Sequence, residues 1–242
     1  MIVPEELKER LENARSIAVF AGAGVSTASG IPTFRGAGQM SYFEGLPPIY
    51  LYSTLCLQRN SSLTYRFLSY LRTIYAEARP NLAHRILAAW QREALRRRYV
   101  KFYLLTTNVD GLLEQAGAIA CELHGRIDRN ICSNCGGIGS GDTCSCGGKI
   151  RPDVVLLGEH VPEKAYEGAI TATRGCELYF AIGTSGVQSH SMGLVQLVKA
   201  RPRATIIEIN ERPSYLTSHC HYVLRGKAEE ILAEFGYGNR FL

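Results

Sequence analysis

Short, uniformly apolar segments recur along the chain, separated by longer amphipathic ones. Several of the apolar segments are β-branched or aliphatic throughout, which is typical of strands that are buried on both faces of a parallel sheet. The predicted strands are Ser16–Ala21, Lys101–Thr106, Leu178–Ile182, Ala204–Ile209 and Tyr222–Leu224.

The longer segments repeat apolar residues at helical spacing. The predicted helices are Glu5–Ala14, Ser62–Ala78, Asn81–Arg98, Pro162–Thr173, Met192–Ala200 and Ala228–Glu234. Because strands and helices alternate, the sequence predicts an α/β fold built on a Rossmann-like, doubly wound and mostly parallel sheet.

Composition adds bounds to this picture. With 242 residues and 46% hydrophobic residues, the chain suits one large domain with a small insert. The net charge of +5 is a mild excess that favours the phosphates of a cofactor or an acidic partner. The densest basic run, Arg92–Lys101, is interpreted as a solvated helix end, because cations favour that end of the helix dipole. No aromatic stacking platform for nucleic acid accompanies it.

The beginning of the chain, MIVPEELKER, carries charge where a secretory leader needs an apolar run. No stretch approaches the roughly 18 uninterrupted apolar residues of a membrane span. We therefore expect a cytoplasmic protein whose thiols stay reduced.

Four of the eight cysteines crowd together with the spacing Cys132-x2-Cys135-x8-Cys144-x-Cys146. In a reducing compartment such a cluster indicates a metal site rather than disulfides. Four thiolates suit one tetrahedral Zn²⁺ ion and leave no open position for catalysis. The predicted role of the zinc is therefore structural.

Two segments interrupt the alternation of strands and helices. Residues 36–80 open with a long loop and continue into a helix, and residues 128–149 are too rich in glycine and cysteine to form a core alone. We predict that together they form a small domain, a helical module plus a zinc ribbon. Residues 1–35, 81–127 and 150–242 are then predicted to form the larger, Rossmann-like domain.

The first predicted strand runs into Gly22-Ala23-Gly24. Gly-x-Gly at this place lets the backbone approach a pyrophosphate, and a following helix would offer N–H donors. Thr27 stands where a dinucleotide-binding fingerprint has its third glycine, so a simple tight turn is an equal alternative. The motif does not support a hydride-transferring dehydrogenase.

The longer run from Gly22 to Gly36, GAGVSTASGIPTFRG, closely resembles the nucleotide-binding signature of the sirtuin family. Further motifs of that family follow in its order along the chain. They are Thr106-Thr107-Asn108-Val109-Asp110-Gly111-Leu112, Leu123-His124-Gly125, Arg151-Pro152-Asp153-Val154-Val155, Gly158-Glu159, Gly183-Thr184-Ser185 and Ile209-Asn210.

The resemblance implies a prokaryotic-type, NAD-dependent protein-lysine deacetylase or deacylase that releases nicotinamide and O-acyl-ADP-ribose. In that reaction the acyl-lysine oxygen attacks C1′ of the nicotinamide ribose, and a ribose hydroxyl, losing its proton to a base, then attacks the acyl carbon. Histidine has the side-chain pKa nearest to neutrality, and the family context assigns this role to His124. The other histidines are interpreted as structural: His84, His160, His190, His219 and His221.

Asn108 and Asp110 follow the second predicted strand, at the edge where ligands bind in open α/β sheets. A turn or helix cap is the alternative for this pair. The resemblance implies that NAD contacts Gly22, Ala23, Gly24, Thr27, Phe34, Arg35, Thr107, Asn108, Asp110, Gly183, Thr184, Ser185 and Asn210. It implies that acyl-lysine contacts Val154, Val155, Leu156, Leu157, Gly158 and Glu159.

The chain departs from the family in several places. Thr107 replaces a glutamine, Leu156 and Leu157 replace a bulky aromatic pair, and the usual proline after Ser185 is missing. The helix before Pro80 lacks the Tyr-x-x-Arg pair of relatives that remove acidic acyl groups. We therefore predict a preference for neutral acyl groups.

Three alternatives remain open at this point. The first is a mono-ADP-ribosyltransferase, the second an NAD or ADP-ribose binding module without catalysis, and the third a zinc-ribbon nucleic-acid binder that uses Arg96–Arg98. The expected partners are acylated-lysine proteins, with chromatin proteins and metabolic enzymes as candidates. We expect no direct nucleic-acid binding and no membrane contact, and the oligomeric state stays open.

Overall fold

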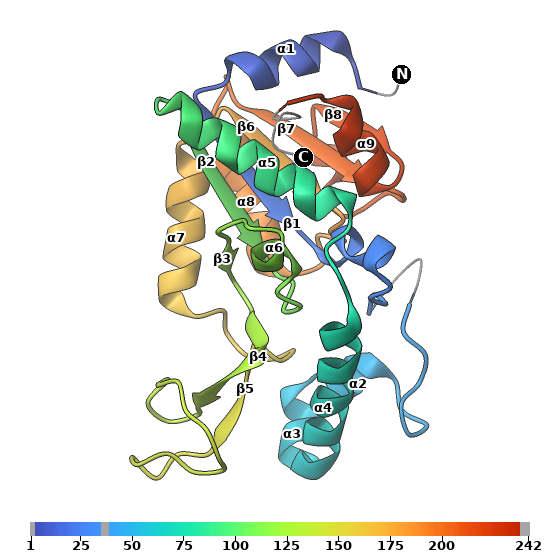
Figure 1. The fold of residues 1–242 in the computed structure, drawn as a ribbon, viewed down its shortest axis with the longest axis vertical. Helices are drawn as coiled ribbons and strands as arrows, with labels where there is room; N and C mark the ends of the chain where they lie inside the picture. The colour runs from blue at the N-terminus through green and yellow to red at the C-terminus, as the bar shows by residue number, and fades with distance from the viewer. Residues whose placement is uncertain (1–2, 35–38, 238–242) are drawn as a thin grey trace.

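The computed structural model describes residues 3–34 and 39–237, and its centre is one sheet of six parallel strands (Figure 1). The strand order β3-β2-β1-β6-β7-β8 reverses direction between β1 and β6, as in doubly wound nucleotide-binding folds. The strands are β1 (Ser16–Ala21), β2 (Lys101–Thr106), β3 (Cys121–Glu122), β6 (Leu178–Ile182), β7 (Thr205–Asn210) and β8 (Tyr222–Arg225). The predicted doubly wound parallel sheet is confirmed.

Helices cover both faces of the sheet because its central strands are apolar on both sides. All six residues of β1 are buried. Ile17, Val19 and Ala21 join the core on one face, while Ala18 and Phe20 join the core on the other. The first face is covered by α1 (Glu5–Asn13), α5 (Leu82–Arg97) and α9 (Ala228–Glu234), and the second by α7 (Glu163–Arg174) and α8 (Ser189–Lys199).

Two further segments lie together at the end of the molecule toward which the strands of the sheet point (Figure 1). One contains α2 (Pro48–Leu51), α3 (Thr54–Arg59) and α4 (Ser61–Glu77). The other is an antiparallel ribbon of β4 (Gly125–Cys132) and β5 (Ile150–Val154), with the cysteine-rich loops between the two strands. Together they carry an apolar cluster separate from the cores on the sheet. The division into two domains stays a prediction.

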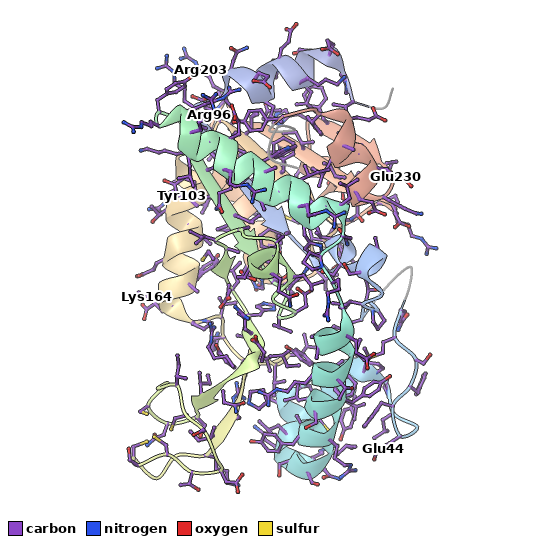
Figure 2. The ribbon with its side chains drawn as sticks, viewed as in Figure 1. Glu44, Arg96, Tyr103, Lys164, Arg203 and Glu230 are labelled. Carbon is purple, nitrogen blue, oxygen red and sulfur yellow. The ribbon has the colours of Figure 1, made fainter. Side chains whose placement is uncertain are left out.

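Besides the shared apolar cluster, hydrogen bonds from one side chain connect the ribbon to the helical segment. The Arg72 guanidinium, on α4, donates hydrogen bonds to the backbone oxygens of Ile127 and Arg129 and to Oδ1 of Asn130, all on β4. Farther from the sheet, Glu44 pairs with Arg66 of α4 at 2.7 Å, near the lower end of the view in Figure 2.

Besides the two strands of the ribbon, three of the elements that the sequence did not predict are very short. Strand β3 has two residues, α2 has four, and α6 (Leu112–Gln115) has four, which is too few for a periodic pattern. Helix α8 begins at Ser189, three residues before its predicted start. Across the described ranges, we find no helix with the length and apolar character that a membrane crossing requires.

Candidate active site

A cavity of about 610 Å³ lies between the carboxyl ends of the sheet strands and the helical segment. Loops after β1, β2, β3, β5, β6 and β7 line it, so the topology brings distant motifs together. The predicted site residues in its lining are Gly22, Ala23, Gly24, Thr27, Phe34, Thr107, Asn108, Asp110, His124, Val155, Leu156, Leu157, Gly158, Glu159, Gly183, Thr184, Ser185 and Asn210. Val154 is instead buried in the apolar cluster that the helical segment and the ribbon share. Arg35 lies outside the described residues.

The glycines of the first motif are needed for packing between loops. The Gly24 amide donates to the Gly183 oxygen at 2.8 Å. A Cβ added to Gly24 would lie 2.7 Å from Gly183 Cα, and one added to Gly22 would lie 2.7 Å from the Gly183 oxygen. The loops after β1 and β6 can therefore meet only through bare backbone. The chain continues from there into two short 3₁₀ turns, not into the α-helix that the motif suggested.

A buried hydrogen-bond network centred on Ser26 lies behind the glycine loop. The Ser26 hydroxyl donates to Asp110 Oδ2 at 2.7 Å and accepts from Asn108 Nδ2 at 3.1 Å. Its oxygen is also 3.3 Å from His84 Nε2. The network ties the loop after β1 to the loop after β2 and to the start of α5.

The protonation pattern of this network follows from one backbone donor. The Asn81 amide donates to His84 Nδ1 at 3.2 Å, so Nδ1 carries no proton and Nε2 carries the proton. His84 therefore donates to Ser26, whose own proton is directed at Asp110. Burial, and then the charge of Arg85, lower the pKa of His84 to about 4, which keeps this tautomer neutral. Burial raises the pKa of Asp110, and the hydrogen bonds to its carboxylate oppose that rise.

His124 lies in the turn between β3 and β4, where the backbone demands glycine next to it. Gly125 has φ 71°, and a Cβ on it would lie 2.3 Å from the Asp153 oxygen. The His124 oxygen accepts from the Val155 amide at 3.1 Å, which fixes the turn against the segment after β5. Burial, and then the charge of His190, lower the pKa of His124 to about 4, so the ring is neutral near pH 7.

The Nε2 atom of His124 is buried and has no hydrogen-bond partner among the described residues. A buried polar atom without a partner costs free energy unless a ligand or water binds it. Since His124 lines the cavity, a neutral imidazole nitrogen is available there to take a proton.

The segment after β5 is tied to the helical segment through its backbone. The Leu157 amide donates to the Tyr52 oxygen at 3.0 Å, and the Leu157 oxygen accepts from the Thr54 amide at 2.9 Å. Glu159 pairs with Arg151 at 2.7 Å and accepts from the Leu156 amide at 2.9 Å. The predicted acyl-lysine residues therefore form a rigid rim between the sheet and the helices.

The cavity wall on the helical side is mostly apolar. Tyr52 packs against Phe34 with ring centroids 5.0 Å apart and ring planes tilted by 41°. Ile49, Tyr75 and Leu157 complete this wall. Within the described part of the chain, the lining contains one arginine, Arg212, which follows β7 on the sheet side, and no lysine.

The two arginines of the helical segment that an acidic ligand could recruit are engaged elsewhere. Arg72 binds β4, and Arg79 donates to the backbone oxygens of Ala76 and Ala78 at the end of α4. Neither lines the cavity.

The four clustered cysteines come together although their burial differs. The sulfur atoms of Cys132, Cys135, Cys144 and Cys146 all lie within 4.8 Å of one another. The Cys132–Cys146 and Cys135–Cys144 sulfur distances are 3.4 and 3.8 Å. Zn–S bonds of about 2.3 Å in a tetrahedron separate sulfur atoms by about 3.8 Å, so the donor set fits Zn²⁺.

Sequence reasoning missed several residues that the structure brings to the site. Ser26 lies inside the first motif, and its small polar side chain was a signal that the motif itself offered. Tyr52 and Tyr75 gave no signal, because they lie in the segment with the weakest pattern. His84 and His190, both interpreted as structural, lie in the network behind the glycine loop and in the cavity lining.

A parallel sheet of this strand order, with a glycine-lined cavity at the point where the order reverses, defines a nucleotide-binding α/β protein. The model of the Sir2 family matches residues 22–189. The chain belongs to the Sir2 family, the sirtuins, as the motifs predicted.

Named relatives agree with this assignment. An NAD-dependent protein deacylase of Methylococcus capsulatus is 36% identical over 246 residues, covering 94% of each chain. One from Thermus thermophilus is 35% identical over 238 residues, covering 95% of this chain and 92% of the relative.

Solved structures agree as well. A Sir2 homologue mutant in complex with 2′-O-acetyl ADP ribose superposes with a TM-score of 0.86 at 30% identity, covering 99% of this chain and 96% of that one. A Sir2 homologue in complex with NAD has a TM-score of 0.84 at 29% identity, covering 99% and 94%.

Proposed function

We propose that this chain removes acyl groups from protein lysines and consumes NAD in doing so. The observation that carries the proposal is a neutral imidazole of His124, whose buried Nε2 atom has no hydrogen-bond partner among the described residues, in a cavity between a glycine loop and an apolar wall. Membership in the Sir2 family, with relatives named NAD-dependent protein deacylases, supports the reaction class. The products are deacylated lysine, nicotinamide and O-acyl-ADP-ribose.

NAD, as the co-substrate, binds along the sheet side of the cavity in this proposal. Gly22, Ala23 and Gly24, which line the cavity at the end of β1, face its pyrophosphate in this proposal. Thr184, Ser185 and Asn210 hold the adenosine end. Asn210 supports this assignment because its amide donates to the Thr184 oxygen at 2.8 Å, which joins the loops after β6 and β7.

The nicotinamide end lies in this proposal near Asn108 and Asp110. The Ser26 network holds both side chains in fixed orientations, so they need no reorganisation when the ligand binds. Phe34 shields the departing nicotinamide from water, and Thr27 and Thr107 complete the polar lining. Arg35, outside the described residues, keeps its proposed role beside the phosphates.

The chemical role proposed for His124 is that of general base. Its neutral imidazole takes a proton from a ribose hydroxyl, which raises the nucleophilicity of that oxygen toward the acyl carbon. A base with a depressed pKa is a weaker proton acceptor but stays unprotonated over a wider pH range. The buried position of the ring also excludes bulk water from the transfer.

Acyl-lysine enters in this proposal along Val155–Glu159, a segment that lines the cavity and is held in place by the backbone hydrogen bonds of Leu157. Val154 supports this segment from below instead of lining the cavity. The four cysteines would hold one structural Zn²⁺ ion and stabilise loops that bury little apolar surface.

The remaining parts of the proposal concern setting and partners. Thiolates that bind zinc must stay reduced, which fits a cytoplasmic location. Acylated-lysine proteins, with chromatin proteins and metabolic enzymes as candidates, are the proposed substrates.

The test is incubation with NAD and a panel of acyl-lysine peptides, read by mass spectrometry. Deacylation predicts loss of the acyl mass from the peptide and an equal amount of O-acyl-ADP-ribose. Gain of an ADP-ribose mass on the peptide, with the acyl group retained, would instead show transfer of ADP-ribose. Cofactor binding with neither product would show a binding module.

A further inference from the structure

His190 lies against His124 at the wall of the cavity. The two ring centroids are 5.2 Å apart and the ring planes meet at 78°, an edge-to-face contact. His190 is the second residue of α8, and both histidines line the cavity. The contact therefore joins the start of a helix on one face of the sheet to the turn between β3 and β4.

Both rings leave a nitrogen available. The Nε2 atoms of His124 and His190 are buried and lack a hydrogen-bond partner within the described ranges. Each ring could accept a proton, but two imidazolium ions about 5 Å apart repel each other strongly where water is excluded. One proton on the pair therefore opposes the second, and the two rings titrate as a coupled unit.

We infer that His190 is a positioning residue for His124: it holds the ring of His124 by edge-to-face packing and competes for the same proton, so that His124 stays unprotonated in mildly acidic solution. The inference deepens the proposed function and rests on it, because a base must be unprotonated to act.

The surroundings of the two rings favour a proton on His190 over a proton on His124. Burial lowers the pKa of both rings, so the ring that is less buried takes the proton more readily. His124 is the more deeply buried of the two, at 7% exposure, and His190 is only partly buried. A proton that reaches the pair therefore costs less on His190, and its charge lowers the pKa of His124 further.

Other charged groups on the elements around His124 are engaged with partners of their own. The pairs are Glu122 and Asp153 with Arg129, Arg126 with Asp128, Glu159 with Arg151, and Asp110 with Ser26. Because these groups are already paired, His190 remains the titratable side chain in ring contact with His124 among the described residues.

Two substitutions at one position test the inference. His190→Gln keeps a polar side chain and removes the competing proton site, while His190→Lys places a cation there. NMR titration of the His124 ring in the ligand-free full-length protein should give a midpoint about one pH unit higher in the glutamine variant. In the lysine variant the midpoint should move down.

The pH profile of deacylation should follow. The ratio of kcat/KM at pH 8 to kcat/KM at pH 5 should rise in His190→Gln and fall in His190→Lys. A merely structural role would lower kcat/KM by the same factor at every pH. An unchanged His124 midpoint, or shifts in the same direction for both variants, would overturn the inference.

The titration also separates this inference from the proposed function, because it needs no turnover. A shifted midpoint together with full turnover by His124→Ala would reject His124 as the general base. The coupling between the two rings would still be supported. An unshifted midpoint together with an inactive His124→Ala would support His124 as the general base. It would reject the positioning role of His190.

Discussion

The sheet-side wall of the cavity is built from backbone and fixed polar groups, whereas the wall on the helical side is built from apolar side chains. On the sheet side, Gly24 and Gly183 meet backbone to backbone, and the Ser26 network leaves little freedom to shift. On the helical side, Phe34, Tyr52 and Tyr75 offer apolar ring surfaces, whose contacts with a ligand are not directional.

The difference matches the two ligands in the proposal. A nucleotide has one fixed pattern of charges and hydrogen-bonding groups, so a preorganised wall suits it. Acyl groups vary in length and carry few polar atoms, so an adaptable apolar wall suits them. Substitutions on the sheet side should therefore abolish deacylation. Substitutions on the helical side should instead change which acyl groups are removed.

The largest expected effect concerns the cysteine cluster beneath the rim. Cys135→Ala should reduce the zinc content from one ion per chain to none, and the loops between β4 and β5 should lose their protection from proteolysis. The three remaining thiolates, without a metal, cannot replace the binding free energy of a structural Zn²⁺ ion. Metal analysis and limited proteolysis measure both effects.

Cys220→Ala, outside the cluster, serves as the matched control and should keep its zinc. Folded, active protein that contains no zinc would contradict the structural role.

His124 lies where the two walls meet, and its loss comes next in size. His124→Ala should reduce deacylation by about 10²–10⁴-fold, the usual cost of losing a general base, with the fold retained. Steady-state kinetics and circular dichroism give the two readings. His160→Ala, an exposed histidine outside the cavity lining, is the control. Turnover by His124→Ala within a few-fold of the wild type would remove His124 from its assigned role.

Ser26 tests how rigid the sheet-side wall is. Ser26→Ala would leave Asp110, Asn108 and the Nε2–H of His84 without their common partner, and the free energy of unfolding should fall by about 1–3 kcal/mol. Denaturant unfolding measures this loss. Ser62→Ala, an exposed serine on α4, should change the free energy of unfolding by less than about 0.5 kcal/mol. Equal stabilities for the two variants would mean that water replaces the Ser26 hydroxyl without penalty.

The fold of the sheet could be predicted because its strands are apolar on both faces, and each predicted strand is within one or two residues of the observed one. Strand β3 escaped prediction because its two residues, Cys121 and Glu122, form no pattern. Helices α2 and α3 escaped because short helices stabilised by tertiary contacts carry little periodicity of their own.

Some residues of the site could likewise be predicted from the sequence, and others could not. Glycines, Asn108 and His124 could be identified because they lie in contiguous motifs. Tyr52 and His190 could not, because each reaches the cavity from an element whose place only the folded chain defines.

The smallest expected effect concerns the apolar wall on the helical side of the cavity. It is a preference among acyl groups. Acetyl-lysine and longer neutral acyl-lysines should be turned over, while succinyl-lysine should be a poor substrate, because its carboxylate would be buried against Phe34 and the tyrosines without a cation. Each additional buried methylene contributes up to about 0.8 kcal/mol where there is room. The measurement is kcat/KM for acetyl, butyryl, myristoyl and succinyl forms of one peptide.

Leu157→Phe sharpens this test, since a larger ring at the rim should lower kcat/KM for myristoyl more than for acetyl. If succinyl equals or exceeds acetyl, a cation such as Arg212 reaches the acyl group after all.

The hydrogen bonds from Arg72 of α4 to β4 have a consequence for sequence variation. Two of its three partners are backbone oxygens, which every amino acid supplies, and Asn130 alone contributes a side chain. Mutations along β4 can therefore accumulate without loosening the joint, provided that the strand keeps its path. The hydrogen bonds of Arg72 therefore depend more on the path of the ribbon backbone than on the side chains of β4.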